Sequence, residues 1–145
     1  MSEILTVSQI KVPGSATTKD EAIREAGQIL VDTGAVTPAY VDAMFEREKS
    51  VSTFMGNYLA IPHGTNEAKD EITASALSVV RYDSPIDWDG NEVRFAVGIA
   101  GYEGGHLEIL GKIAVIFSDT DEVDKMIAAG SAEEVFALLN AVNEE

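Results

Sequence analysis

The sequence contains two histidines, His63 and His106, and no cysteine. Imidazole is the side chain whose charge and nucleophilicity are most easily tuned near neutral pH. We therefore expect covalent chemistry in this chain to depend on these two residues. The lack of a thiol excludes disulfides, thiolate chemistry and cysteine-based zinc or iron–sulfur sites.

His63 stands between Pro62 and Gly64 at the end of a short apolar run. Proline restricts the incoming chain, and glycine allows the outgoing backbone to approach a ligand closely. The polar residues 65–70 could form a short helix whose amides face an anion, with the Thr65 hydroxyl as a further donor. The arrangement suits a bound phosphate. The alternative, from this context alone, is a solvent-facing histidine at a strand end.

A second histidine and two basic residues are the other candidates for such a site. His106 follows two glycines at the start of a predicted helix, where the helix dipole favours a neutral ring. Its alternative role is a helix cap or a buried packing residue. Arg47 and Lys49 are two of only ten basic residues, and a phosphoryl group needs a cation nearby. For both, a solvated helix end is the alternative.

Several other classes of site have no support in the sequence. The two histidines show no HxH or HExxH spacing, which disfavours a metal site. No GxSxG motif occurs, and the glycines of residues 101–105 match neither a P-loop nor a dinucleotide fingerprint. We expect neither metal nor cofactor, and a hydrolase with His63 as general base is disfavoured.

Composition limits the partners and the location. The 145 residues are 46% hydrophobic, which predicts one domain over residues 1–145. A net charge of −15 would repel nucleic acid and anionic lipid and favours a basic protein partner. The sequence has neither an apolar stretch of roughly 20 residues nor the layout of a secretory signal, which predicts a cytoplasmic protein without membrane insertion.

Capping signals and apolar spacing predict the helices. Thr18 and Glu21 form a capping box before an apolar periodicity that Gly34 should end, and Thr37 with Pro38 begins a second helix. The helix that starts at residue 106 is apolar over most of its surface, so it should be largely buried. Two further helices are expected at about residues 121–129 and 132–142, the latter with a capping box.

The strands are predicted from shorter apolar runs. Residues 4–12 indicate an edge strand or a strand-like arm, and residues 74–82 and 93–100 are expected to pair as an antiparallel hairpin. A loop containing Pro85 and a turn at residues 89–91 should separate them. Helices on both faces of one mixed sheet would give a three-layer α/β/α sandwich.

The run Ile-Pro-His-Gly-Thr at residues 61–65, continued by residues 67–70, closely resembles a known phosphorylation-site segment. It is that of the mannitol-type A components (EIIA) of bacterial phosphoenolpyruvate-dependent sugar phosphotransferase systems. The resemblance covers nearly the whole chain and includes residues 47–49, 56–57, 98–100 and 106–107.

This resemblance implies a cytoplasmic phosphocarrier in sugar uptake. His63 would accept a phosphoryl group from the histidine-containing phosphocarrier protein (HPr). It would pass the group to a cysteine of the EIIB component of the mannitol permease, and through EIIB to the membrane component EIIC. His106 would help to hold the phosphoryl group, and Arg47 would neutralise its charge. The alternative is a regulatory EIIA of the nitrogen-regulatory type, in which phosphorylation of His63 controls a partner; Thr65 and residues 67–70 favour the mannitol branch.

Overall fold

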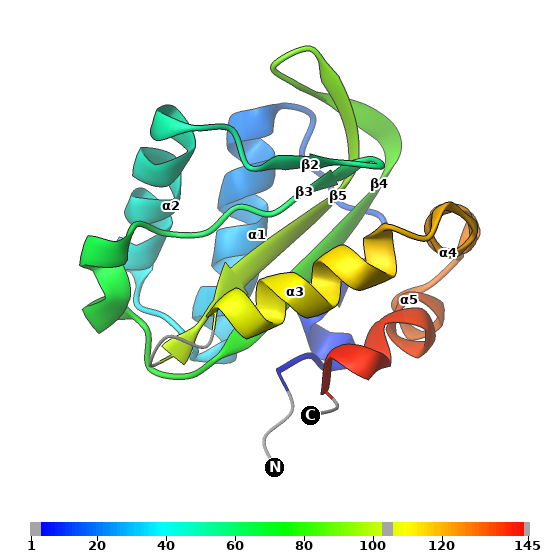
Figure 1. The fold of residues 1–145 in the computed structure, drawn as a ribbon. Helices are drawn as coiled ribbons and strands as arrows, with labels where there is room; N and C mark the ends of the chain where they lie inside the picture. Colours follow the sequence, from blue (N-terminus) through cyan, green and yellow to red (C-terminus); the bar gives the residue numbers. More distant parts are fainter. Residues whose placement is uncertain (1–3, 103–105, 144–145) are drawn as a thin grey trace.

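A mixed sheet forms the middle layer of the protein (Figure 1). The computed structural model describes residues 4–102 and 106–143, and within them the sheet has five strands in the order β1-β4-β5-β3-β2. β1 pairs with β4, and β3 with β5, in parallel, whereas the β4–β5 and β2–β3 pairs are antiparallel. The strands are β1 (Ile10–Lys11), β2 (Phe54–Gly56), β3 (Leu59–Ala60), β4 (Ala76–Trp88) and β5 (Asn91–Ala100).

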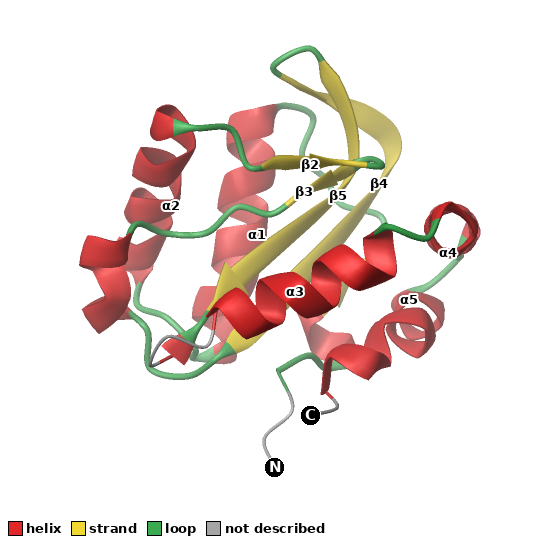
Figure 2. Ribbon diagram, viewed as in Figure 1, coloured by secondary structure: helices red, strands yellow, loops and turns green. Residues whose placement is uncertain are grey.

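Helices cover both faces of this sheet (Figure 2). One face carries α1 (Lys19–Thr33) and α2 (Pro38–Ser50), and the other carries α3 (His106–Phe117), α4 (Thr120–Ala128) and α5 (Ala132–Leu139). Short 3-10 helices are η1 (Val7–Gln9), η2 (Asn66–Glu71) and η4 (Asn140–Asn143). The predicted three-layer α/β/α sandwich is confirmed. In the described ranges, no helix is long and apolar enough to cross a lipid bilayer.

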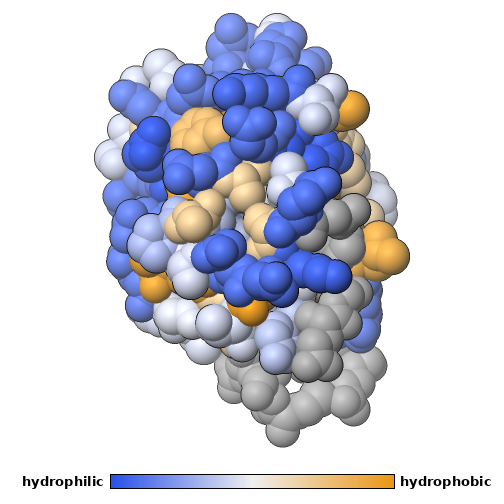
Figure 3. All heavy atoms as spheres, turned by 90° about the vertical axis from the view of Figure 1, so that its left-hand side faces the viewer, coloured by the Kyte–Doolittle hydropathy of each residue, from blue (hydrophilic) through white to orange (hydrophobic). Residues whose placement is uncertain are grey.

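Alternation along the two long strands builds two separate cores. On β4, Leu77 and Val79 face the α3–α5 layer, whereas Val80 and Tyr82 face α1 and α2. Successive side chains of a strand point to opposite faces, so a strand buried on both sides is apolar throughout. The side of the molecule formed by α2 and η2 is in contrast covered mainly by hydrophilic side chains (Figure 3).

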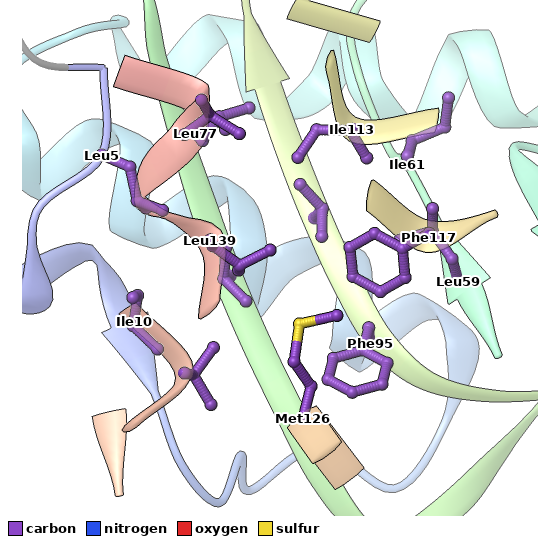
Figure 4. Close-up of a cluster of buried hydrophobic side chains, with 14 of the residues drawn as sticks. Leu5, Ile10, Leu59, Ile61, Leu77, Phe95, Ile113, Phe117, Met126 and Leu139 are labelled. Atoms are coloured by element: carbon purple, nitrogen blue, oxygen red, sulfur yellow. The ribbon is translucent and has the colours of Figure 1, made fainter. Parts of the chain in front are cut away.

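Leucine, isoleucine, phenylalanine and methionine side chains fill the core under α3, α4 and α5 (Figure 4). Phe95 of β5 and Phe117 of α3 pack edge to face there, with ring centroids 5.3 Å apart. The opposite side of β5 carries small residues, and a Cβ on Gly98 would lie 2.4 Å from the Ser78 Oγ and 3.3 Å from the Ala26 Cβ. Helix α1 can therefore lie close to the sheet.

The predicted helix boundaries are set by the expected caps. The Thr18 side chain accepts a hydrogen bond from Glu21 N, and Gly34 ends α1 in a left-handed conformation with φ of 86°. The Glu21 carboxylate in turn accepts from Thr17 N at 2.9 Å. Ser131 likewise accepts from Glu134 N at the start of α5. These caps confirm the sequence signals.

Three predictions for individual elements were wrong in part. The first was the prediction that Pro85 lies in a loop. Pro85 instead lies inside β4, at a register shift between Arg81 and Ile86. A bulge accommodates proline because the missing N–H interrupts no regular ladder there. The hairpin itself is confirmed, and its turn places Asp89 and Gly90 at φ of 55° and 93°, which suits a tight two-residue connection.

The second correction concerns α3, which is buried on one stripe only. Ile109, Ile113 and Phe117 are buried, but Leu107 and Val115 are each 71% exposed. Helix α3 belongs to an outer layer of the sandwich, so its outer face remains in solvent however apolar it is.

The third correction concerns the arm at residues 4–12, which is strand only at Ile10–Lys11, beside Val79 and Val80. Before it, the buried Gln9 amide donates to the carbonyls of Ile4 and Leu77 and so replaces a strand ladder. The arm is thus held to β4 by side-chain bonds as well as by strand pairing.

A partly buried carboxylate anchors the chain that follows this arm. Glu25 of α1 accepts hydrogen bonds from the Nζ of Lys11, the N and Oγ of Ser15, the N of Ala16 and the hydroxyl of Tyr82. Burial alone would raise the pKa of Glu25, but these donors lower it from 4.5 to about 2. The same burial raises the pKa of Tyr82, which keeps its hydroxyl a donor.

Glu25→Gln should lower the free energy of unfolding at pH 7 by about 1–3 kcal/mol, the size of a charge-assisted hydrogen bond. Because the folded pKa lies below the unfolded one, the carboxylate contributes fully above pH 4.5, and its contribution is lost as the pH falls toward 2. Urea unfolding at pH 7 and pH 3 should therefore show a difference between wild type and variant that shrinks at pH 3. The exposed Glu92→Gln is the control, and a pH-independent difference for Glu25→Gln would contradict the assignment.

Candidate functional site

A pocket of about 770 Å³ opens beside α2 and η2, on the side of the molecule shown in Figure 3. Segments far apart in the sequence form its wall: α2, the chain from β3 through η2, the residue after β5, and α3. The lining residues are Tyr40, Arg47, Ile61, His63, Gly64, Thr65, Glu67, Lys69, Ile72, Gly101 and Leu110. The structure thus brings His63 and Arg47 to one cavity, as predicted.

His63 lies just beyond β3, where the chain still follows β5. β3 pairs in parallel with β5 through Leu59 and Phe95, and His63 forms an isolated parallel bridge with Ile99. Ile99 N donates to the Pro62 carbonyl at 3.1 Å. The prediction that His63 stands at a strand end is confirmed, and the sheet holds its backbone in place.

The imidazole of His63 is oriented by its own chain. Its Nδ1 lies 2.7 Å from the carbonyl oxygen of Ile61. A carbonyl oxygen only accepts, so Nδ1 carries the hydrogen, and in the neutral ring Nε2 then carries the lone pair. The side chain is half-buried at the pocket wall. Nε2 is therefore the ring nitrogen that a phosphoryl group would bond to.

Gly64 is in close contact with Tyr40 of α2. Its N–H donates to the Tyr40 hydroxyl at 2.9 Å, and a Cβ on Gly64 would lie 2.5 Å from the Tyr40 Cε1. A close approach that requires glycine is thus made to the Tyr40 ring. Gly64 is not among the residues with positive φ, so space and not backbone conformation excludes a side chain here.

The polar stretch after Gly64 forms a helix, as expected, but of the 3-10 type. Thr65 is its N-cap residue, makes no side-chain cap bond, and lines the pocket. The helix also brings Glu67 and Lys69 to the pocket wall. Lys69 was missed as a site cation because the sequence pattern identifies η2 only as a polar surface segment.

Of the two predicted cations, only Arg47 lines the pocket. Its Nη1 donates to the Val51 carbonyl at 2.9 Å, and its guanidinium has further donors for an anion. The Lys49 side chain is 74% exposed and pairs with Glu46. Positions two apart on a helix face different directions, so one helix end cannot bring both to the same cavity.

A buried carboxylate, that of Glu48, stabilises the backbone beside the site. The Glu48 side chain is 3% exposed, and it accepts hydrogen bonds from Thr53 N at 2.9 Å and from the Trp88 Nε1 at 3.1 Å. The Thr53 carbonyl in turn accepts from Ile61 N at 3.0 Å, and Ile61 holds the His63 ring. No local sequence pattern indicates this role, because Glu48 stands within a charged helix end.

The second histidine is placed only by its backbone. His106 is the first residue of α3, and Leu110, one turn later, lines the pocket. The side chain of His106 and the backbone of residues 103–105 lie outside the described part of the chain. The predicted contribution of His106 to the site stays a prediction.

Comparison with known proteins gives concordant matches over almost the full length. The family model described as phosphoenolpyruvate-dependent sugar phosphotransferase system, EIIA 2, matches residues 3–142. The mannitol-specific phosphotransferase enzyme IIA component of Halalkalibacterium halodurans is 53% identical over 141 residues, covering 97% of each chain.

Two solved structures show how far the similarity extends. A chain in the complex of enzyme IIAMTL and phosphorylated enzyme IIBMTL from Escherichia coli superposes with a TM-score of 0.87 at 33% identity, covering 93% of this chain and 96% of that one. The nitrogen regulatory protein IIA-Ntr from Neisseria meningitidis matches with a TM-score of 0.81 at 31% identity, covering 94% of this chain and 96% of that one.

These matches confirm the resemblance first seen at residues 61–65. The family model and the relatives span the pocket and both outer layers, so the likeness is not confined to one motif. The chain belongs to the EIIA 2 family of the phosphoenolpyruvate-dependent sugar phosphotransferase system and is a phosphocarrier with phosphotransferase activity.

Proposed function

We propose that this protein is a mannitol-type EIIA that carries its phosphoryl group on Nε2 of His63. It accepts the group from HPr and passes it to the cysteine of the EIIB component of a mannitol permease, which serves the membrane component EIIC. It acts in the cytoplasm. The observation that carries this proposal is the hydrogen bond from His63 Nδ1 to the Ile61 carbonyl, which leaves Nε2 as the nucleophile.

The first transfer step follows from this geometry. The lone pair of Nε2 attacks the phosphorus of the phosphorylated donor. The new N–P bond forms as the donor's P–N bond breaks, and the electron pair of that bond returns to the donor ring. The His63 ring becomes cationic when Nε2 bonds to phosphorus, and the Ile61 carbonyl stabilises this charge through Nδ1–H. In the second step, the thiolate of EIIB attacks phosphorus and Nε2 regains its electron pair.

Electrostatics in the pocket support both steps. Among the described residues that line the pocket, two are cationic, Arg47 and Lys69, and one is a carboxylate, Glu67. The pocket is therefore less acidic than the chain as a whole, which carries a net charge of −15. Fixed cations stabilise the equatorial oxygens of a transferring phosphoryl group. We assign the neutralisation of phosphate charge to Arg47 and assign His106, at the start of α3, to holding the phosphoryl group.

The partners follow from charge and from relatives. The acidic surface would attract a basic donor protein such as HPr. A structural relative is known in complex with phosphorylated IIB, which supports EIIB as acceptor. The mannitol-specific relative is 53% identical, whereas the nitrogen regulatory relative is 31% identical. Sugar uptake is therefore favoured over the regulatory role.

His63→Ala should lose all phosphorylation, because Nε2 is the acceptor. The purified protein is incubated with phosphoenolpyruvate, enzyme I and HPr, and the mass increase of a phosphoryl group is measured. His106→Ala is the companion variant and should still be labelled, since we assign it only to holding the group. Phosphorus and nitrogen NMR of the labelled wild type should show an Nε2–P bond. Labelling of His63→Ala, or a bond to Nδ1, would refute the proposal.

Arg47→Gln should slow transfer from HPr by about 10²-fold, corresponding to a few kcal/mol of transition-state stabilisation. Lys49→Gln removes an equal charge two residues away, outside the pocket, and is expected to transfer at the wild-type rate. Rapid-quench measurement of the transfer rate compares the two variants. Equal rates for Arg47→Gln and Lys49→Gln would remove Arg47 from the site.

A further inference from the structure

Tyr40 has a buried hydroxyl that the transfer steps above do not use. The residue is 3% exposed, lies on α2 and lines the pocket. Its hydroxyl donates to the Ile99 carbonyl at 2.7 Å and accepts from Gly64 N at 2.9 Å. Burial raises the pKa of Tyr40, so the hydroxyl keeps its proton and remains a donor.

The two groups that this hydroxyl joins belong to a strand pair. His63 and Ile99 form a parallel bridge, in which Ile99 N donates to the Pro62 carbonyl. In a regular parallel ladder, the next bond would run from Gly64 N to the Ile99 carbonyl. Here the Tyr40 hydroxyl lies between that donor and that acceptor and connects them. The hydroxyl thus ties the residue after His63 to the end of β5.

The backbone is consequently held on both sides of His63. Before His63, the Pro62 carbonyl is bound to Ile99 N, and after His63, Gly64 is bound to the Tyr40 hydroxyl. The Tyr40 ring also fills the space beside Gly64, where a Cβ would lie 2.5 Å from Cε1. Tyr40 therefore fixes the position of the backbone next to the imidazole.

We propose that Tyr40 is a positioning residue for phosphoryl transfer, whose hydroxyl fixes the backbone after His63 so that Nδ1 stays bonded to the Ile61 carbonyl and Nε2 keeps the lone pair. This inference rests on the proposed function of His63 as the phosphoryl acceptor. In-line transfer depends strongly on the placement of the attacking atom, and small displacements cost large factors in rate. The hydroxyl acts on the reaction only through the position of His63.

Tyr40→Phe tests this role, because it keeps the ring and removes only the hydroxyl. The transfer rate at saturating HPr should fall about tenfold, with an unchanged apparent KM, since the variant alters the acceptor atom and not the docking surface. Tyr82→Phe is the matched control: Tyr82 is 1% exposed and its hydroxyl donates to Glu25, away from the pocket. It should lose stability to urea and transfer at the wild-type rate.

The nitrogen NMR spectrum of His63 supplies a readout that does not depend on transfer. In the wild type, the neutral ring should be protonated at Nδ1; in Tyr40→Phe, the population protonated at Nε2 should rise. The ring in Tyr82→Phe should resemble the wild type. Wild-type rate and spectrum in Tyr40→Phe would overturn the inference, and so would equal slowing in Tyr82→Phe.

The two proposals can fail separately. A wild-type protein that HPr does not phosphorylate would refute the proposed function, but the NMR comparison of Tyr40→Phe with Tyr82→Phe would still decide whether the hydroxyl orients His63. Labelled wild type together with an unaffected Tyr40→Phe would leave the function intact and refute the positioning role alone.

Discussion

The site depends on the parallel pairing of the His63 segment with the end of β5. This pairing carries the chain from β3 past Pro62 to Ile99 and places the imidazole at the pocket wall. The bond from His63 Nδ1 to the Ile61 carbonyl then leaves the lone pair of the neutral ring on Nε2, the nitrogen that we propose carries the phosphoryl group. Because these contacts are made at the sheet, strand pairing holds the backbone that carries the imidazole, as precise group transfer requires.

Helix α2 contributes side chains that line the pocket or support its wall. Tyr40 holds the backbone after His63, Arg47 brings a cation to the pocket, and Glu48 bonds Thr53, whose carbonyl holds Ile61. Glu48 is also 3.4 Å from the Lys19 amine of α1. A buried carboxylate with several donors stabilises one arrangement of the elements that meet around it, because any other leaves its charge unsatisfied. The support of the site is therefore part of the packing between α1, α2 and the β4–β5 hairpin.

Much of the fold could be predicted from the sequence because its signals are local. The caps at Thr18, Gly34 and Ser131 act within one helical turn, and the β4–β5 hairpin follows from apolar runs beside a tight turn. Errors arose where a distant neighbour decides the outcome. The bulge at Pro85 depends on the strand alongside, and the exposure of Leu107 depends on the absence of another layer above α3 in the described chain.

The sequence by itself determined the family, and it was sufficient to predict His63 as the phosphoryl acceptor and a cation from the end of α2. Both the histidine between proline and glycine and the run that resembles a phosphorylation site can be recognised within a single chain segment. The tertiary structure alone decided that Arg47 and not Lys49 lines the pocket, that Lys69 joins it, and that Gly64 is needed to fit Tyr40. The physical reason is distance along the chain: Tyr40, Gly64 and Ile99 meet only when α2 packs beside the finished sheet, and no local pattern records that contact.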